Sequence, residues 1–392
     1  MRRALSRLIA GQIFLHACMA GMRMATPLLA LKQGYSPMAV GALLSLFALT
    51  QVFIAVPAGR YTDRVGLGRP VAIAVVIAAL GAALPALWPV FAVLCLSALA
   101  TGGATGLAVI ALQRHVGRLA RDTTELKSAF SWLSIGPAVS NFLGPVLAGV
   151  LIDHAGPQPA DTLGFRAAFA LMAVLPLVSW LVLRHVQEHR RSASAPATGH
   201  GRTLDLLREP LMRRLLLVNW LLSSCWDVRT FVVPVLGHER GLSASVIGSV
   251  LGAFAMAAAL IRMSLPWMAR HLHEHQIIGG AMLATGVLFG LYPFMPNAGA
   301  MGVCSVLLGL ALGSVQPMLM STLHQITPEH RQGEALGLRL LSINASSVLM
   351  PSLFGAAGAV AGVSLVFWVV GASVGLGSRL GWRLRPRSHA HG

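Results

Sequence analysis

The chain has 392 residues, of which 55% are hydrophobic and only 11% charged, and its mean hydropathy is +0.71. Soluble domains carry about 25% charged residues, so this composition excludes a soluble protein and indicates one that crosses a membrane many times. The net charge of +17 does not indicate nucleic-acid binding, because the basic residues fall in alternate loops. The opposite loops hold only Lys32, Arg166 and Arg240. This bias predicts that both termini are cytoplasmic.

Twelve apolar runs are each long enough to cross a hydrocarbon core of about 30 Å. Each is expected to be an α-helix, because only a helix closes its backbone hydrogen bonds within one segment. The first run is too long for a cleaved signal peptide and is expected to remain as a helix. In chain order the predicted spans are 7–31, 37–58, 70–88, 90–113, 128–152, 165–184, 213–236, 244–265, 276–296, 298–322, 335–358 and 363–382.

The longest polar break, 185–212, is rich in Ser, Ala, Pro and Gly and is typical of a flexible linker. It divides the chain into a six-helix bundle (1–184), a cytoplasmic linker and a second six-helix bundle with a short basic tail (213–392). The fold class predicted is therefore an all-α membrane protein with two pseudo-symmetric bundles of six helices.

The two halves repeat each other in sequence. A shift of 207 residues places Gln12 on Asn219, Cys18 on Cys225 and Pro27 on Pro234, and it aligns Gly41 with Gly248. A shift of 206 places Pro145 on Pro351 and Gly149 on Gly355. Two sets of six helices in the same orientation form a parallel repeat, and transporters commonly place the substrate site between such repeats.

A short motif between the second and third spans carries the clearest resemblance to a known family. Gly59, Asp63, Arg64 and Gly66 stand in the order Gly-x-x-x-Asp-Arg-x-Gly, which resembles the signature of the major facilitator superfamily. The resemblance extends over essentially the whole chain. It implies alternating access, in which Asp63 holds the cytoplasmic side closed against the start of the span 335–358. Arg339 or the positive end of that helix would be its partner.

A second motif lies in the fifth span, where Gly136, Gly144, Pro145 and Gly149 resemble the motif associated with antiporters of that family. Gly and Pro in a membrane helix also serve close packing and kinking alone, and this alternative stays open. Two features depart from drug/proton antiporters. The outer part of the fourth span, 96–103, lacks the expected Arg, and Cys18 stands where some antiporters carry an acid.

Two polar stripes occupy equivalent positions of the repeat. Gln12, His16 and Arg23 share one face of the first span, at 100° per residue. In the seventh span, Asn219, Ser223, Asp227 and Thr230 share a face in the same way. Paired stripes that end in charges favour a shared water-filled cavity. The alternative is scattered polar groups that bond to backbone carbonyls.

Asp227 alone among the 13 acidic residues lies well inside a predicted span. A carboxylate at membrane depth costs several kcal/mol unless it is paired, solvated or protonated. We expect Asp227 to face Arg23 across the cavity and to titrate during transport; a static ion pair is the alternative. His16 is a second candidate proton carrier. Further candidates to line the cavity are Asn141, Trp226, Gln316 and Asn344.

These features predict a secondary transporter rather than an enzyme, with no cofactor and no bound metal. The run His271, His273 and His275 is interpreted as a solvated loop. No nucleotide-binding loop is present, so a proton gradient is the expected energy source. The favoured function is proton-coupled efflux of a small organic molecule by a monomer in a bacterial inner membrane. The alternatives are proton-coupled uptake of an organic anion, attracted by Arg23 and Arg229, or a non-transporting membrane sensor.

Overall fold

A computed structural model describes residues 2–119, 132–133, 135–186, 203–327 and 332–384. Twelve helices in these ranges are long and apolar enough to cross a membrane, as predicted. The start of the fifth span, most of the linker and the basic tail lie outside the described residues. The helices are α1 (Arg2–Lys32), α2 (Pro37–Val65), α3 (Gly68–Leu87), α4 (Phe91–Leu119), α6 (Ile135–His154), α7 (Thr162–Leu183), α8 (Pro210–Glu239), α9 (Ala244–His271), α10 (Glu274–Leu291), α11 (Ala298–Ile326), α12 (Gln332–Ala361) and α13 (Val363–Trp382), with short 3-10 helices η1 (Thr203–Arg208) and η2 (Tyr292–Phe294).

Capping residues fix several helix ends that the apolar runs left imprecise. The hydroxyl of Ser36 accepts a hydrogen bond from the Ala39 N–H, and Pro37 opens α2 at a position where a missing N–H costs nothing. Asp161 caps α7 through the Thr162 N–H. Gly66 ends α2 with a φ of +83°, a left-handed conformation that favours glycine.

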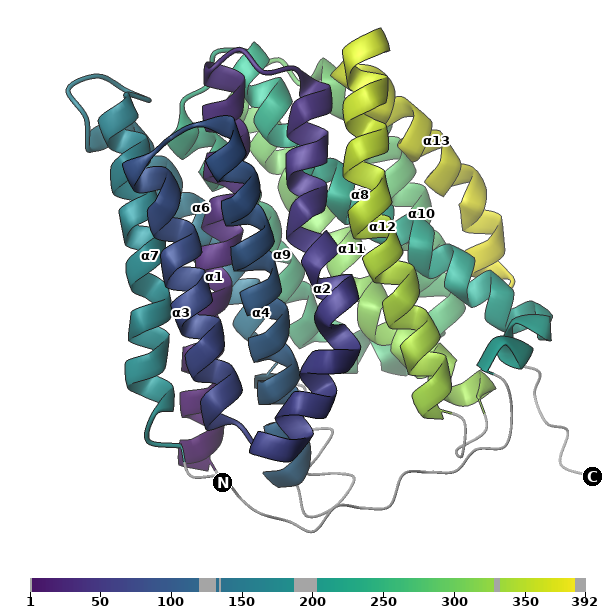
Figure 1. Cartoon of the computed structure of the whole chain (residues 1–392). Helices are drawn as coiled ribbons and strands as arrows, with labels where there is room; N and C mark the ends of the chain where they lie inside the picture. The colour runs from purple at the N-terminus through teal and green to yellow at the C-terminus, as the bar shows by residue number, and fades with distance from the viewer. Residues whose placement is uncertain (1, 120–131, 134, 187–202, 328–331, 385–392) are drawn as a thin grey trace, which may run out of the picture.

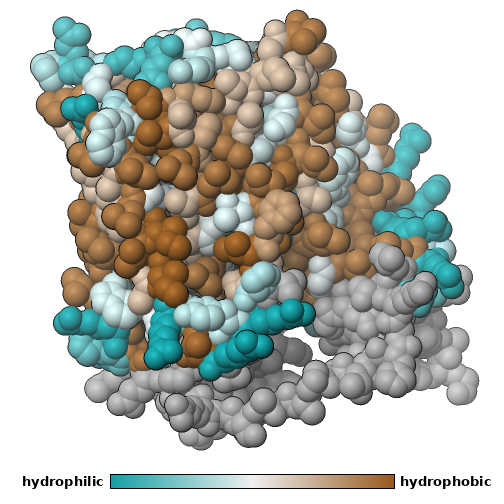
Figure 2. Space-filling model, in the orientation of Figure 1, coloured by the Kyte–Doolittle hydropathy of each residue, from teal (hydrophilic) through white to brown (hydrophobic). Residues whose placement is uncertain are grey.

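The helices stand side by side in two groups, α1 to α7 and α8 to α13 (Figure 1). The start of α1 and the end of α13 lie toward the same end of the molecule, which we call the termini face. The opposite end, the distal face, carries the α1–α2, α6–α7, α8–α9 and α12–α13 connections. On the face that Figure 2 shows, apolar residues cover the middle of the molecule and hydrophilic residues lie toward both ends, as expected for a protein surrounded by lipid.

The two halves meet along two helix pairs, α6 with α9 and α2 with α12. In the α6–α9 seam, a Cβ atom on Gly149 would collide with the carbonyl oxygen of Ala244, and one on Gly248 would collide with the Pro145 carbonyl. The helices therefore touch backbone to backbone, which only glycine permits.

The α2–α12 seam has the same construction. A Cβ atom on Gly355 would lie 2.7 Å from the Pro37 carbonyl oxygen, and one on Gly41 would collide with the Pro351 carbonyl. By the shifts of 207 and 206 residues that align the two halves, the Gly355–Pro37 contact corresponds to the Gly149–Ala244 contact. The Gly41–Pro351 contact corresponds in the same way to Gly248–Pro145. The repeat seen in the sequence is therefore a repeat of the contacts that join the halves.

These seams also show what the antiporter-like motif in α6 does in the fold. Gly149 and Pro145 form the seam with α9, whereas Gly144 faces α1, where an added Cβ would lie 2.6 Å from the Ala17 carbonyl oxygen. Gly136 lies against the side chain of Gln12. Every member of the motif thus allows a close approach of α6 to another helix, in agreement with the packing alternative.

We predict that Gly149→Ala destabilises the folded protein by about 1–3 kcal/mol, because the added methyl group has no space against α9. Gly302→Ala is the matched control: it lies in α11 and a Cβ there meets no atom within 4 Å. That change should be neutral or slightly stabilising. Thermal unfolding of the purified variants measures both effects, and equal midpoints would contradict the tight seam.

Candidate functional site

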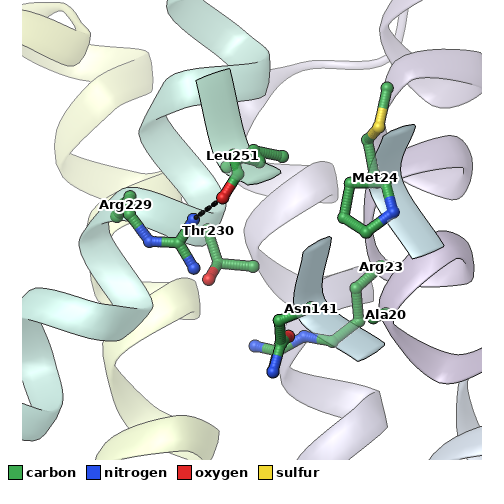
Figure 3. A pocket seen from close by; sticks show the side chains of 8 residues that line it. Ala20, Arg23, Met24, Asn141, Arg229, Thr230 and Leu251 are labelled. Atoms are coloured by element: carbon green, nitrogen blue, oxygen red, sulfur yellow. Dashed lines mark hydrogen bonds between the residues drawn. The ribbon is translucent and has the colours of Figure 1, made fainter. Parts of the chain in front are cut away.

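A pocket lies between the two halves, beside the α6–α9 seam (Figure 3). It encloses about 330 Å³ of empty space, counting its open mouth. Helices α1 and α6 of the first half and α8 and α9 of the second contribute its walls. The lining residues are Ala20, Arg23, Met24, Asn141, Pro145, Arg229, Thr230 and Leu251.

Arg229 forms one wall of this pocket. Its guanidinium carbon lies 4.0 Å from the ring centroid of Phe254 and 5.7 Å from that of Trp226. Its Nη1 donates to the Leu251 carbonyl at 3.4 Å, while its Nε is buried without a hydrogen-bond partner. Arg229 is 5% exposed. Aromatic faces thus hold the cation in place while part of its hydrogen-bonding capacity stays unused.

Arg23 and Asn141 approach from the other half, and Figure 3 shows the two guanidinium groups directed toward the space between the halves. The Nε of Arg23 is also buried without a hydrogen-bond partner. Asn141 donates its amide to the Pro137 carbonyl at 2.7 Å, which leaves its side-chain oxygen as an acceptor. Two cations from opposite halves therefore border one small space.

Asp227 lies close by but turns toward α12. It is 4% exposed, and its carboxylate accepts hydrogen bonds from Ser346 at 2.8 Å and Ser347 at 3.2 Å. Among the described residues, no ion pair within 4.0 Å joins it to Arg23 or Arg229, although its charge interacts electrostatically with both. The expected arrangement with Arg23 across the cavity remains a prediction about the transport cycle.

Asn219, another member of the polar stripe on α8, also meets α12, because its amide donates to the Ser342 hydroxyl at 3.5 Å. Ser224, outside the stripe, has its hydroxyl 3.4 Å from that of Ser346 on the same helix. Helix α8 therefore joins its own half through the stripe, and it presents Arg229 and Thr230 to the pocket. Trp226 packs edge to face on Phe254, with centroids 4.8 Å apart, and Ser223 is half-buried.

The stripe on α1 lies at the interface with α6. Gln12 is 3% exposed and stands beside Gly136, with its side-chain oxygen unpartnered. His16 is half-buried, and its Nδ1 has no hydrogen-bond partner. Neither residue borders the pocket that Arg23 lines. The structure likewise leaves Gln316, which is exposed, and Asn344, which is half-buried, outside that pocket.

The motif at the end of α2 is described only in part. Gly66 caps the helix, and its N–H donates to the Thr62 carbonyl. Gly59 has open space around it and Arg64 is exposed, but the side chain of Asp63 lies outside the described part. Arg339 is 5% exposed, and its Nε and Nη2 have no hydrogen-bond partner among the described residues. The contact between Asp63 and the start of α12 therefore stays a prediction.

Asp153, at the end of α6, is an inter-half contact that the sequence analysis missed. Its Oδ1 accepts from the Ala244 N–H at 3.1 Å and its Oδ2 from the Ser245 N–H at 2.6 Å. These are the first two residues of α9. Asp153 directly follows the predicted span 128–152 and resembled an ordinary loop acid, so only the three-dimensional pairing of α6 with α9 reveals its partner.

No group of three or more His, Cys, Asp or Glu side chains that could hold a metal occurs in the described part. Of the histidine run, His273 and His275 stack with ring centroids 5.6 Å apart.

Comparison with known proteins identifies the family. The sequence matches the Major Facilitator Superfamily over residues 8–320 and 230–392, which together span nearly all of the chain. The chain belongs to the major facilitator superfamily. It is accordingly a multi-pass membrane transporter and not an enzyme.

Several characterised members of the family are similar to this chain along most of its length. The class E tetracycline resistance protein of Escherichia coli is 27% identical over 323 residues, covering 80% of this chain and 77% of that protein. The class G protein of Vibrio anguillarum is 29% identical over 344 residues, covering 85% and 84%. Multidrug resistance protein 1 of Bacillus subtilis (strain 168) is 23% identical over 341 residues, covering 84% and 83%.

Solved structures support the fold. An inward-facing, occupied bacterial homolog of the human lysosomal transporter Spinster superposes with a TM-score of 0.78 at 13% identity, covering 97% of this chain and 96% of that chain. A mutant of the nucleoside transporter NupG gives a TM-score of 0.76 at 12% identity, covering 97% and 99%. At such low identities these likenesses establish the twelve-helix architecture only.

We predict that Ser346→Ala destabilises the protein by about 1–3 kcal/mol, because it leaves a buried carboxylate short of a hydrogen bond. In the background of Asp227→Asn the same change should cost less, since no charge remains to be solvated. Ser373→Ala is the control: this exposed serine on α13 bonds only to its own helix, at Val369. Thermal unfolding of the wild type, the two single variants and the double variant measures the cost of Ser346→Ala in both backgrounds. Equal costs would contradict the contact.

Proposed function

We propose that this transporter exports a small organic molecule in exchange for protons, by alternating access between its two halves. One observation carries the proposal: Asp227 is a buried carboxylate held by two hydroxyls, with no cation in contact among the described residues. The names of the relatives, tetracycline and multidrug resistance proteins, support efflux. The resemblance of the α6 motif to antiporters supports exchange.

The coupling would work through the charge of Asp227. Keeping a carboxylate ionised at membrane depth costs several kcal/mol, and the serine hydroxyls offset part of this cost. When the carboxyl takes up a proton, the charge next to the interface changes by one unit while Arg23 and Arg229 keep theirs. Such a change favours one arrangement of the halves over the other. His16 is a second candidate for carrying the proton.

Exchange follows if substrate and proton compete for the same carboxylate. A neutral or cationic molecule gains from the negative field of Asp227, and it loses this gain when the residue is protonated. Proton entry from the acidic side would then favour release of the molecule, and release of the proton on the other side would restore binding. This is the linkage that an antiporter requires.

The proposal predicts that Asp227→Asn abolishes the pH-driven part of transport but leaves binding measurable. Purified protein in liposomes with an imposed pH gradient is assayed with tetracycline and, separately, with the fluorescent cation ethidium. Wild type should concentrate one of these probes against its gradient, and the variant should only equilibrate it. Asp161→Asn, in a helix cap on the distal face, is the matched control and should transport as wild type does. Unchanged pH dependence in the Asp227 variant would exclude it as the carrier.

A second candidate function is uptake of an organic anion together with a proton. The specific observation in its favour is the pocket between Arg23 and Arg229, in which both Nε groups are buried without a partner. An anionic group can use these donors in bidentate geometry. Protonation of Asp227 would make the region more positive and so strengthen anion binding, which gives symport rather than exchange.

The sign of the pH effect on binding separates the two functions. Binding of salicylate, as a simple aromatic anion, should tighten on acidification if the anion function holds, and Arg229→Gln should abolish this binding. Binding of ethidium should weaken on acidification if the exchange function holds, and Arg229→Gln should leave it intact or improve it. Isothermal titration with purified protein at two pH values measures both. Absence of any proton-dependent binding or flux would favour the sensor alternative.

The membrane placement completes the proposal. The loop charges support an orientation with both termini in the cytoplasm of a bacterial inner membrane, so the distal face would lie outside. The chain would act as a single-chain transporter, since both halves of its interface are contained in one polypeptide.

A further inference from the structure

The two seams between the halves share their glycine contacts but differ in one polar interaction. In the α6–α9 seam, the carboxylate of Asp153 accepts the N–H groups of Ala244 and Ser245 at 3.1 and 2.6 Å. In the α2–α12 seam, the hydroxyls of Ser45 and Ser352 meet at 2.8 Å. The first contact joins a charge to a helix end, and the second joins two neutral groups.

The contact of Asp153 has the chemistry of a helix N-cap. The first N–H groups of an α-helix have no partner within the helix, and a carboxylate there also gains from the helix dipole. Such caps usually come from the residue just before the helix. At α9 the hydroxyl of that residue, Ser243, accepts from the Val246 N–H at 3.4 Å and lies 3.0 Å from the Ser245 hydroxyl. Asp153 is 8% exposed and supplies the rest of the cap from the other half.

The repeat shows that this cap is specific to one seam. The counterpart of Ala244 in the first half is Pro37, which has no N–H to donate, and the counterpart of Asp153 is Ala359. The acceptor and one of the two donors are therefore missing from the α2–α12 seam, although the glycine contacts are shared by the two seams. The close packing is symmetric, whereas the charge that reinforces it is confined to α6 and α9.

We propose that Asp153 is a gate residue that holds the distal face closed by capping α9 across the interface. When the distal face opens, α6 and α9 separate. The Asp153 carboxylate and the two backbone N–H groups then lose their mutual hydrogen bonds and bond to water instead. The closed state is favoured by the difference in free energy between these two sets of hydrogen bonds. The proposal concerns which face is open and does not depend on the substrate or on proton coupling.

The test measures how often the distal face opens. The probe is placed in the α2–α12 seam, which Asp153 does not contact. Ser45→Cys places a thiol in the α2–α12 seam, where the native side chain is 7% exposed. A charged maleimide labels this thiol only when the seam opens, so the labelling rate reports the open fraction. The same proteins without Ser45→Cys give the background from the four native cysteines.

Asp153→Ala should raise the labelling rate roughly fivefold, the equivalent of a typical lost helix cap. Asp161→Ala is the matched control, because Asp161 caps a helix on the same face but within its own half. It should label at the wild-type rate. A rate unchanged by Asp153→Ala, or raised equally by both changes, would overturn the proposal.

A second variant acts from the other side of the contact. Ala244→Pro removes one of the two N–H donors, and proline is tolerated at the first position of a helix, as Pro37 shows in α2. It should raise the labelling rate by less than Asp153→Ala, and it should add nothing in the Asp153→Ala background. Additive effects would overturn the proposal. If Asp153→Ala does not yield folded protein, an unchanged labelling rate for Ala244→Pro would by itself overturn the proposal.

Discussion

The arrangement of the molecule depends on backbone contact between helices of opposite halves. Where Gly149 faces Ala244 and Gly355 faces Pro37, no side chain separates the two helices. In lipid no hydrophobic force drives helices together, so van der Waals contact at small residues supplies much of the attraction. Close approach also lets short side chains reach across the interface. The hydrogen bonds of Asp153 and of the Ser45–Ser352 pair exist only because glycine brings the helices near.

The sequence predicted the architecture because two independent signals agreed. Apolar runs located the twelve spans, and the internal shifts paired the halves; the same shifts later matched the seam contacts one by one. What the helical period could not supply was the neighbour that each face meets. Asp227 and Asn219 share a face as predicted, but that face bonds to α12. Arg229, only two residues from Asp227 in sequence, instead lines the pocket between the halves. Periodicity fixes directions around one helix, whereas partners follow from packing.

The charges of the interface break the symmetry that the packing keeps. Arg23 has Thr230 as its counterpart, Asp227 has Ala20, and Asp153 has Ala359. A symmetric scaffold lets the halves rock with similar contacts in either arrangement, so the free-energy difference between arrangements rests on these few unmatched groups. Single charges worth about one or two kcal/mol can then shift the equilibrium, because the larger packing terms nearly cancel.

The pocket and the distal cap are built on the same two helices. Pro145 and Leu251 line the pocket, and Pro145 also touches Gly248 in the seam that Asp153 closes about two turns away. A molecule that fills the pocket must lie against both α6 and α9. The size and shape of the bound molecule therefore affect the distance between α6 and α9, the two helices that the Asp153 cap holds together. Because glycine leaves no compressible side chain between them, a small displacement at the pocket would be transmitted to the cap.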